Sequence, residues 1–357
     1  MTSVRMMTTG AVAALLLAAG GAFAATVEKS AKVAPGLYEL VFNPTDGDLY
    51  IASTGLRDGS AKAKIVRMDG TTLAVEGEID VAANPLFGLG LNNRTQVLYG
   101  TDTRGGVVSA IDLKTGKIVG TIKHGTNAHL REVVVDEADN KAYASMVGGG
   151  EGRGGGPLPP SEIWVINGAN HSLERVISVP DVQLLGIALD KPGNRIIGTD
   201  LRGNRIVVVD LATDKVVKTW PAGAERPTNL VYDAAGKRLF VANQSGSLSV
   251  LNSDTGEVIK VVPTGAGALS VAYNRAKNQI YVANRGASTL SVVDGTTYAV
   301  TANPTIGTFP QTIALNTAGD RIYVTNKARG APRPAPGAAP APPPEDPGGD
   351  TVAVLRP

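Results

Sequence analysis

Short stretches of β-branched and aromatic residues, separated by turn residues, follow one another along almost the whole chain. The fifth group shows the pattern well, with candidate strands in "TNLVYDAAGK", "RLFVANQSG", "SLSVLNSDTG" and "EVIKVVPTG". Turns such as Ala-Gly-Lys and Asp-Thr-Gly end these stretches. Helical periodicity is absent after Ala24. The pattern predicts an all-β fold of short antiparallel strands.

One hexapeptide pattern returns seven times between Asp48 and Asn326. Its last three copies read "RLFVAN", "QIYVAN" and "RIYVTN", and the earlier ones are "DLYIAS", "VLYGTD", "KAYASM" and "RIIGTD". The third position is always large and apolar, as Tyr50, Tyr99, Tyr143, Ile197, Phe240, Tyr281 and Tyr323. A period of roughly 40 to 50 residues with four strands in each copy predicts a seven-bladed β-propeller. We expect a single domain over residues 25–357.

The two ends of the chain are expected to close this ring. The last repeat contains "PQTIALNTAGD", "RIYVTN" and "TVAVLRP", and then the chain stops one strand short. The segment Thr26–Val33 precedes the first innermost strand and has no partner in its own repeat. It is therefore predicted to pair with the C-terminal blade as the missing outer strand. Such pairing removes an exposed sheet edge that would invite aggregation.

The repeated hexapeptide also carries a family resemblance. "RIYVTN" and "IYVAN", followed by a D-x-x-T/G turn, resemble the YVTN-repeat propellers, in particular the secreted YncE-like proteins of Gram-negative bacteria. The resemblance covers nearly the whole mature chain and is weak in the fourth repeat, where "RIIGTD" lacks both Tyr and Asn. It implies an exported propeller, and some members are linked to single-stranded DNA binding. The motif itself indicates packing, with Tyr and Val inside the blade and Asn at the strand end, and says little about chemistry.

Residues 1–24 form a segment of a different kind. Arg5 precedes an apolar run that ends in Ala22-Phe23-Ala24, which predicts a secretory signal peptide cut before Ala25. The alternative is a single anchoring helix, but the run from Gly10 is broken by glycines and shorter than the roughly 20 apolar residues of a span. The chain has no Cys, which excludes disulfides, thiolate metal sites and lipoprotein attachment. We expect a periplasmic monomer with no membrane span in the mature chain.

Three long connections are predicted on one face of the propeller. They lie near residues 53–64, 148–160 and 328–350, each between the second and third strands of a blade. Insertions gathered on one face often mark the binding side of a repeat protein. The first alternative is that the Gly-rich and Pro-rich loops are tolerated linkers, and the second is a flap or fringe over the propeller mouth.

The net charge of +2 is too small to indicate nucleic-acid or membrane binding, so only the placement of charges is informative. Cations follow the repeated strand in several blades or lie in the loops between blades. The candidate residues for binding an anionic ligand are Arg57, Arg104, Lys123, Arg131, Arg202, Arg226, Arg285 and Lys327. The alternative is ordinary ion pairing, in particular Asp102–Arg104 and Asp200–Arg202.

The face opposite the long loops is predicted to be rich in carboxylates from the turns. These residues are Asp46, Asp48, Asp136, Asp139, Asp190, Asp214, Asp254 and Asp320. A nearly neutral chain could therefore still be polarised between its two faces.

Aromatic side chains near the candidate face are few. Phe87, Trp220 and Phe309 fall in or beside the loops between blades and are candidates for stacking on nucleic-acid bases, with packing at the blade edge as the alternative. His124 and His129 share a loop with Glu132, but two imidazoles make only a weak metal site, so we expect no cofactor. No Gly-x-Ser-x-Gly elbow or haem-binding motif is present.

These observations favour a non-catalytic periplasmic binding propeller whose ligand is an anionic polymer. The family resemblance implies single-stranded DNA as the leading candidate. The first alternative is a cell-envelope interaction scaffold that binds envelope proteins through the Pro-rich segment Ala331–Pro347. The second is a propeller enzyme or a dehydrogenase-type subunit.

Overall fold

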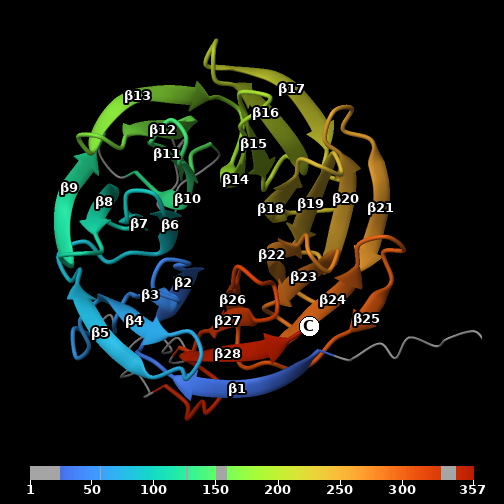
Figure 1. Cartoon of the computed structure of the whole chain (residues 1–357). Coiled ribbons are helices and arrows are strands. Elements are labelled where there is room, and N and C mark those ends of the chain that lie inside the picture. The colour runs from blue at the N-terminus through green and yellow to red at the C-terminus, as the bar shows by residue number, and fades with distance from the viewer. Residues whose placement is uncertain (1–24, 57, 126–127, 150–158, 331–342) are drawn as a thin grey trace, which may run out of the picture.

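Seven four-stranded antiparallel sheets stand around a central axis as the blades of a propeller (Figure 1). The computed structural model describes residues 25–56, 58–125, 128–149, 159–330 and 343–357. The predicted seven-bladed all-β propeller is confirmed within these residues. The predicted signal peptide and Arg57 lie outside them, as does most of the Gly-rich and Pro-rich loops.

Each blade begins with an innermost strand at the axis. These strands are β2 (Leu37–Phe42), β6 (Gly88–Asn92), β10 (Leu130–Asp136), β14 (Leu184–Asp190), β18 (Pro227–Asp233), β22 (Ala268–Asn274) and β26 (Pro310–Leu315). The second strands are β3 (Asp48–Ser53), β7 (Val97–Asp102), β11 (Lys141–Met146), β15 (Arg195–Asp200), β19 (Arg238–Asn243), β23 (Gln279–Asn284) and β27 (Ile322–Asn326).

The outer half of each blade contains two further strands. The third strands are β4 (Lys64–Asp69), β8 (Val107–Asp112), β12 (Ser161–Asn167), β16 (Arg205–Asp210), β20 (Ser247–Asn252), β24 (Thr289–Asp294) and β28 (Thr351–Arg356). The outermost are β5 (Val75–Asp80), β9 (Lys117–Lys123), β13 (Ser172–Val179), β17 (Lys215–Pro221), β21 (Val258–Pro263), β25 (Val300–Ala302) and β1 (Thr26–Lys32). No helix long and apolar enough to cross a membrane occurs in the described part of the chain.

The repeated hexapeptides are the second strands, and both of their predicted packing roles are confirmed. Their aromatic third residues are buried between blades, and Tyr281 and Tyr323 are at most 1% exposed. The asparagine ties the strand end, because Asn284 donates from Nδ2 to Ser291 Oγ at 2.8 Å. Asn326 likewise donates to Ile306 O and Thr351 Oγ1, each at 3.1 Å. The repeat is therefore a packing unit.

The ring closes as predicted, by pairing of the two ends of the chain. Strand β1 lies antiparallel to β28, with the register running from Thr26 opposite Arg356 to Lys32 opposite Thr351. The sheet order β1-β28-β27-β26 makes the N-terminal segment the outer strand of the last blade. In Figure 1 the blue strand and the red strand lie side by side at this seam. Hydrogen bonds between the two ends thus replace a covalent closure.

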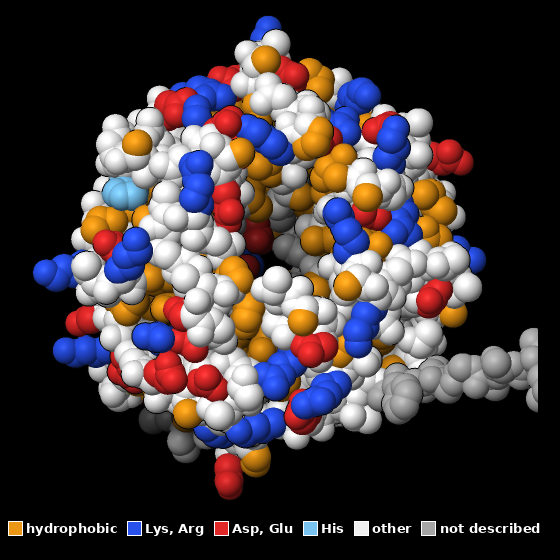
Figure 2. Space-filling model, in the orientation of Figure 1, with side chains coloured by type: hydrophobic (Ala, Val, Ile, Leu, Met, Phe, Trp, Pro, Cys, Tyr) orange, Lys and Arg blue, Asp and Glu red, His pale blue; other side chains and the backbone are white. Residues whose placement is uncertain are grey.

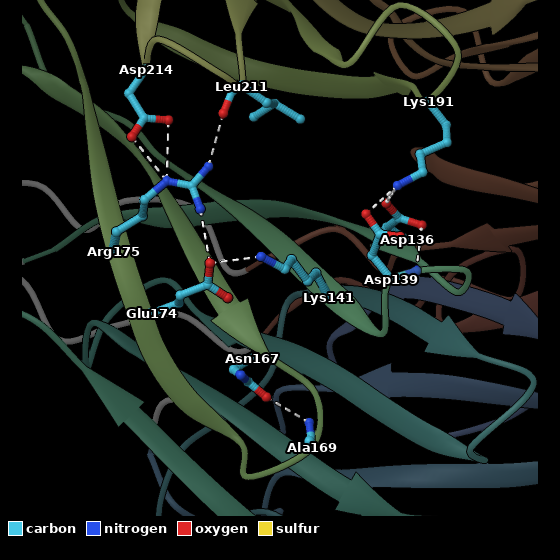
Figure 3. A network of polar contacts seen from close by, with 10 residues as sticks. All are labelled: Asp136, Asp139, Lys141, Asn167, Ala169, Glu174, Arg175, Lys191, Leu211 and Asp214. Atoms are coloured by element: carbon cyan, nitrogen blue, oxygen red, sulfur yellow. Dashed lines mark hydrogen bonds and ion pairs between the residues drawn. The ribbon is translucent and has the colours of Figure 1, made fainter.

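Turns on the face opposite the long loops join neighbouring blades through ion pairs, as Figure 3 shows for blades three and four. Lys191, in the turn after β14, binds Asp136 at 2.7 Å and also contacts Asp139. Arg175 on β13 places Nε 2.9 Å from Asp214 in the next blade. Each pair crosses a blade boundary, so these contacts resist separation of the blades.

The phenol of Tyr323 provides a test of the contact between the last blade and the first. Its hydroxyl is buried and donates to the carbonyl oxygen of Gly70 at 2.8 Å. We expect Tyr323→Phe to lower the free energy of unfolding in urea by about 1 kcal/mol, because the carbonyl of Gly70 loses the shorter of its two hydrogen bonds and keeps the one from Arg321 at 3.3 Å. The control is Tyr298→Phe, whose hydroxyl accepts, among the described residues, only a long contact of 3.5 Å from Arg238. Equal losses of unfolding free energy in the two variants would show that the hydrogen bond from Tyr323 to Gly70 does not stabilise the contact between the last blade and the first.

Candidate functional site

The seven innermost strands enclose a cavity of about 440 Å³ on the propeller axis. Figure 2 shows the hollow at the centre of the ring, with acidic and basic side chains interspersed over the surrounding face. Every blade contributes to the cavity wall through its first strand or the residue just before it. Side chains that are far apart in the sequence therefore face one another across a small space.

Two layers of equivalent residues line the end of the cavity where the innermost strands begin. The first layer is Tyr38, Phe87, Arg131, Leu185, Thr228, Leu269 and Gln311. The second layer, one residue further along each strand, includes Glu39, Gly88, Glu132, Asn229, Ser270 and Thr312. The first layer holds aromatic and basic groups, and the second holds two carboxyl groups. The cavity is thus polar near this end and becomes aliphatic beyond it.

Aromatic rings and cations alternate at this mouth. Tyr38 and Phe87 meet edge to face, with ring centroids 4.6 Å apart. The Lys327 ammonium lies 3.6 Å from the centroid of the Tyr38 ring, and the Arg104 guanidinium lies 5.2 Å from that of Phe87. These are distances at which a cation is attracted by the ring face.

The alternation continues into the sixth and seventh blades. The Arg285 guanidinium lies 4.7 Å from the Phe309 ring centroid, and Arg329 lies 5.9 Å from the same ring. The backbone N–H of Lys327 donates to Phe309 O at 3.2 Å, which joins the two groups. We call the set Arg285, Phe309, Lys327, Tyr38, Phe87 and Arg104 the mouth arc. It extends over the sixth, seventh, first and second blades.

The cations of the mouth arc are available to an outside ligand. Arg104 and Arg285 are exposed, and Lys327 is half-buried. Among the residues that the structure describes, none of the three forms an ion pair with a carboxylate. Burial lowers the pKa of Lys327, and repulsion from Arg285 adds to this while Tyr38 opposes it. Burial of the Tyr38 phenol acts to raise its pKa, but the Lys327 ammonium outweighs this and lowers it.

Both ion pairs that the sequence offered as an alternative for these cations are wrong. Asp102 instead accepts the backbone N–H of Arg104 at 2.8 Å and so shapes its turn. Asp200 pairs with Arg205 at 2.7 Å. Arg202 is exposed, and within the described ranges it forms no ion pair.

The remaining predicted cations are placed differently. Arg131 lines the axial cavity itself. Arg226 donates to Gln244 Oε1 at 2.5 Å, and Lys123 is exposed at the end of β9. Arg57 lies outside the described residues. The structure therefore brings Arg104, Arg285 and Lys327 together with aromatic rings, and places Lys123, Arg202 and Arg226 away from them.

The predicted carboxylates of the opposite face are largely neutralised. Six of the eight form ion pairs with lysine or arginine: Asp48, Asp136, Asp139, Asp190, Asp214 and Asp254. Asp46 and Asp320 accept hydrogen bonds from Asn43 and Asn316. Polarity between the two faces therefore depends on the unpaired cations of the mouth rather than on free carboxylates.

The other aromatic and histidine candidates differ in how far they are buried. Trp220 is 9% exposed on β17, and its ring fills the space that a Cβ on Gly256 would occupy, so it is not available for base stacking. Phe87 is 5% exposed, whereas Phe309 is half-buried. His124 packs edge-on against Trp164 at 5.9 Å between ring centroids, and His129 is exposed. Neither imidazole belongs to the group Asp48, Asp69 and Glu76, which is where described side chains of metal-binding type converge.

Two carboxyl groups that occupy equivalent positions in the first and third blades face the cavity below the mouth arc. Burial and the neighbouring Glu132 raise the pKa of Glu39 well above its usual range, against the attraction of Arg131. Burial raises the pKa of Glu132 to about 7, although Arg131 and a hydrogen bond from Asn229 favour its charged form. Asn229 Nδ2 lies 3.2 Å from Glu132 Oε2. These are the strongest perturbations of carboxyl groups at the axis.

Comparison with known proteins finds similarity to YncE over part of the chain. YncE of Escherichia coli K12, described as uncharacterized, is 31% identical over 176 residues, or 47% of this chain and 47% of that protein. YncE of Salmonella typhi is 29% identical over 235 residues, or 62% and 63% of the two chains. The chain therefore spans only part of the length of these relatives, 47% of the first and 63% of the second. No family model matches it.

A solved structure agrees over almost the whole length. The β-propeller domain of Cps50 (Swd1) from Myceliophteria thermophila superposes with a TM-score of 0.69, covering 93% of this chain and 99% of that domain at 10% identity. At this identity the likeness shows the fold alone. The predicted resemblance is supported by both the partial YncE matches and the shared fold. The chain is similar to YncE over part of its length. The YncE relatives are described as uncharacterized, so the similarity assigns no activity to this propeller.

Sequence reasoning named Arg131 and Phe87 of the first layer but missed Tyr38, Glu39 and the arrangement of the two layers around the axis. A signal for them was present, since aligning the innermost strands places Glu39 of "LYEL" over Glu132 of "LREV". Tyr38, which precedes Glu39, occupies the same position in this alignment as Arg131, which precedes Glu132. The ring partners of the two arginines could not be read in this way, because Phe87 precedes its cation in the chain whereas Phe309 follows its own. The contact of Arg104 with Phe87 lies within the second blade, whereas Arg285 of the sixth blade meets Phe309 just before the seventh, so the folded ring decides both.

The raised pKa of Glu132 predicts a dependence of stability on pH. The folded state binds more protons than the unfolded chain between about pH 4.5 and pH 7, so stability falls as pH rises through this window. Glu132→Gln removes this group and relaxes Glu39, so its stability should fall less steeply. We expect the slopes of unfolding free energy against pH to differ by up to about 1.4 kcal/mol per pH unit. Urea titrations between pH 5 and pH 8 measure both slopes. Identical slopes for the wild-type protein and Glu132→Gln would contradict the raised pKa of Glu132.

Proposed function

We propose that this propeller is an exported, non-catalytic binding protein that holds an anionic polymer at its mouth arc. Single-stranded DNA is the leading candidate. The observation that carries the proposal is the alternation of Arg285, Lys327 and Arg104 with aromatic rings, without ion pairs to described carboxylates. Cations with no protein counter-ion near a concave mouth focus positive potential where a polyanion can approach.

The geometry of the mouth arc suits a flexible strand better than a compact anion. Its three cations come from the sixth, seventh and second blades and so can neutralise successive phosphates. Each guanidinium is held against a ring face, which limits its freedom and reduces the entropy lost on binding. Such contacts recognise the backbone and carry no sequence information.

Base stacking is expected to make only a modest contribution. Phe309 and Tyr38 are half-buried, and Phe87 is covered by Arg104 and Tyr38. Single-stranded nucleic-acid sites usually combine a basic groove with exposed aromatic platforms. Affinity should therefore depend strongly on salt and little on base composition.

Export and the scaffold alternative depend on segments that the structure does not describe. Residues 1–24 support export by their sequence pattern alone. Edman sequencing of protein recovered from the periplasm should begin at Ala25. The Pro-rich segment lies largely outside the described residues, and no observed contact favours a protein partner over a polyanion.

The charge of the mouth arc is the first test of the proposal. We expect Arg104→Glu combined with Arg285→Glu to weaken binding of a fluorescein-labelled single-stranded oligonucleotide by about tenfold or more. The slope of log affinity against log salt should become shallower by about 1.4, because each lost phosphate contact contributes about 0.7. Fluorescence anisotropy across a salt series gives both values.

A matched control separates the arc from net charge. Lys117→Glu combined with Lys260→Glu makes the same change in charge on the exposed outer strands β9 and β21. This variant should retain nearly wild-type affinity. If both double variants weaken binding equally, the mouth arc is not the site. If the wild-type protein binds no oligonucleotide at low salt, the polyanion proposal fails.

A further inference from the structure

The axial cavity separates opposite charges over one step of the innermost strands. Arg131 lies in the first layer, and Glu39 and Glu132 lie in the second. Within the parts of the chain that the structure describes, none of the three forms an ion pair. The hydrogen bond from Asn229 engages one oxygen of Glu132, and the backbone N–H of Leu89 is the hydrogen-bond donor to the Glu39 carboxyl group. The cavity wall therefore presents both signs of charge without pairing them.

Two carboxyl groups facing one small cavity repel each other when both are ionised. Burial adds to this, so the pair retains a proton near neutral pH unless a cation enters. Arg131 is attractive to both but does not approach either closely enough to form an ion pair. A positively charged group inside the cavity would allow both carboxylates to ionise.

The chemistry of the wall favours an organic ammonium over a metal ion. Asn229 turns its Nδ2, a donor, toward Glu132 at 3.2 Å, while its Oδ1 accepts the backbone N–H of Val271 at 3.3 Å, so its oxygen is not directed at the carboxylates as a metal ligand would be. An ammonium group needs only two or three acceptors, and the aliphatic wall beyond, from Val134, Ile187 and Leu230, suits a short carbon chain. A volume of about 440 Å³ lies within the range of small-molecule sites.

We propose that the axial cavity binds a small zwitterion, with its ammonium group between Glu39 and Glu132 and its anionic group at Arg131. This site is independent of the proposed function, because a polyanion needs the exposed cations of the mouth arc and not the carboxyl pair. The Arg131 end lies toward the mouth, where Lys327 above Tyr38 adds to the positive potential. A ligand with only an ammonium group would lack the second contact.

Binding of the ammonium should be linked to release of a proton. The titratable or charged side chains on the cavity wall are Tyr38, Glu39, Arg131, Glu132 and Tyr232. Burial raises the pKa of Glu132 to about 7 and raises that of Glu39 well above its usual range. At pH 6.5 an entering ammonium displaces a proton from the pair. Calorimetry in two buffers of different ionisation enthalpy therefore reports proton release, which binding of ammonium to an exterior carboxylate would not show.

The decisive experiment compares three matched series of probes by calorimetric titration of the mature protein. They are ω-amino acids from glycine to 6-aminohexanoate, the corresponding alkylamines and the corresponding alkanoates. We expect the best ω-amino acid to bind about tenfold more tightly than its alkylamine, with release of protons, and the alkanoates not to bind. Absence of binding across all three series, or equal binding of amine, acid and zwitterion, would overturn the proposal.

Three isosteric or near-isosteric variants assign the two poles. Glu39→Gln and Glu132→Gln should each weaken binding of the best ω-amino acid, and binding of its alkylamine, by about tenfold. Arg131→Gln should lower the affinity for the zwitterion to that for the alkylamine. The affinity for the alkylamine itself should not fall. The control Glu257→Gln, at an exposed turn, should change neither. Thermal unfolding by circular dichroism confirms that each variant is folded.

The two proposals fail separately. Glu39→Gln and Glu132→Gln should retain oligonucleotide binding within about twofold, because they leave the mouth arc intact. Loss of zwitterion binding in Arg104→Glu combined with Arg285→Glu, to the extent seen in Glu132→Gln, would place the small ligand at the arc and overturn the axial site.

Discussion

Every blade of this propeller relies on closure of the ring by β1 and β28. Four-stranded sheets bury their faces only against neighbouring blades, so each blade is stable because two others flank it. The last blade acquires its outer strand from the other end of the chain, through a register that runs from Thr26 to Lys32. Blade contacts such as Tyr323 to Gly70 then join the last blade to the first. A ring closed in this way holds the seven innermost strands at a fixed separation.

That separation determines the electrostatics of the axis. Each inner strand contributes one residue per layer, and the residues of one layer face a common space of about 440 Å³. Groups such as Glu39 and Glu132 are not neighbours in the sequence, yet they line the same cavity. Their pKa values rise because burial penalises charge and because the two carboxyl groups repel each other. The fold therefore turns two ordinary surface-type residues into strongly perturbed ones.

The two faces of the propeller use charge for different purposes. On the face opposite the long loops, Arg175, Lys191 and their carboxylate partners form pairs across blade boundaries. On the loop-rich face, Arg104 and Arg285 lie over aromatic rings and have no carboxylate partner among the described residues. The first arrangement neutralises charge and supports the assembly of the blades. The second leaves positive charge available to an anionic ligand at the mouth.

The architecture is written in the sequence, because propeller repeats encode their packing locally. The period of the hexapeptide, its buried aromatic residue and the unpaired segment at residues 26–33 were sufficient to predict seven blades and the closing strand. Which charges meet is a property of the folded ring alone. Arg104 lies over the ring of Phe87 in its own blade rather than pairing with Asp102, and Glu39 and Glu132 line one cavity from different blades, because folding brings together residues whose spacing in the chain carries no such information.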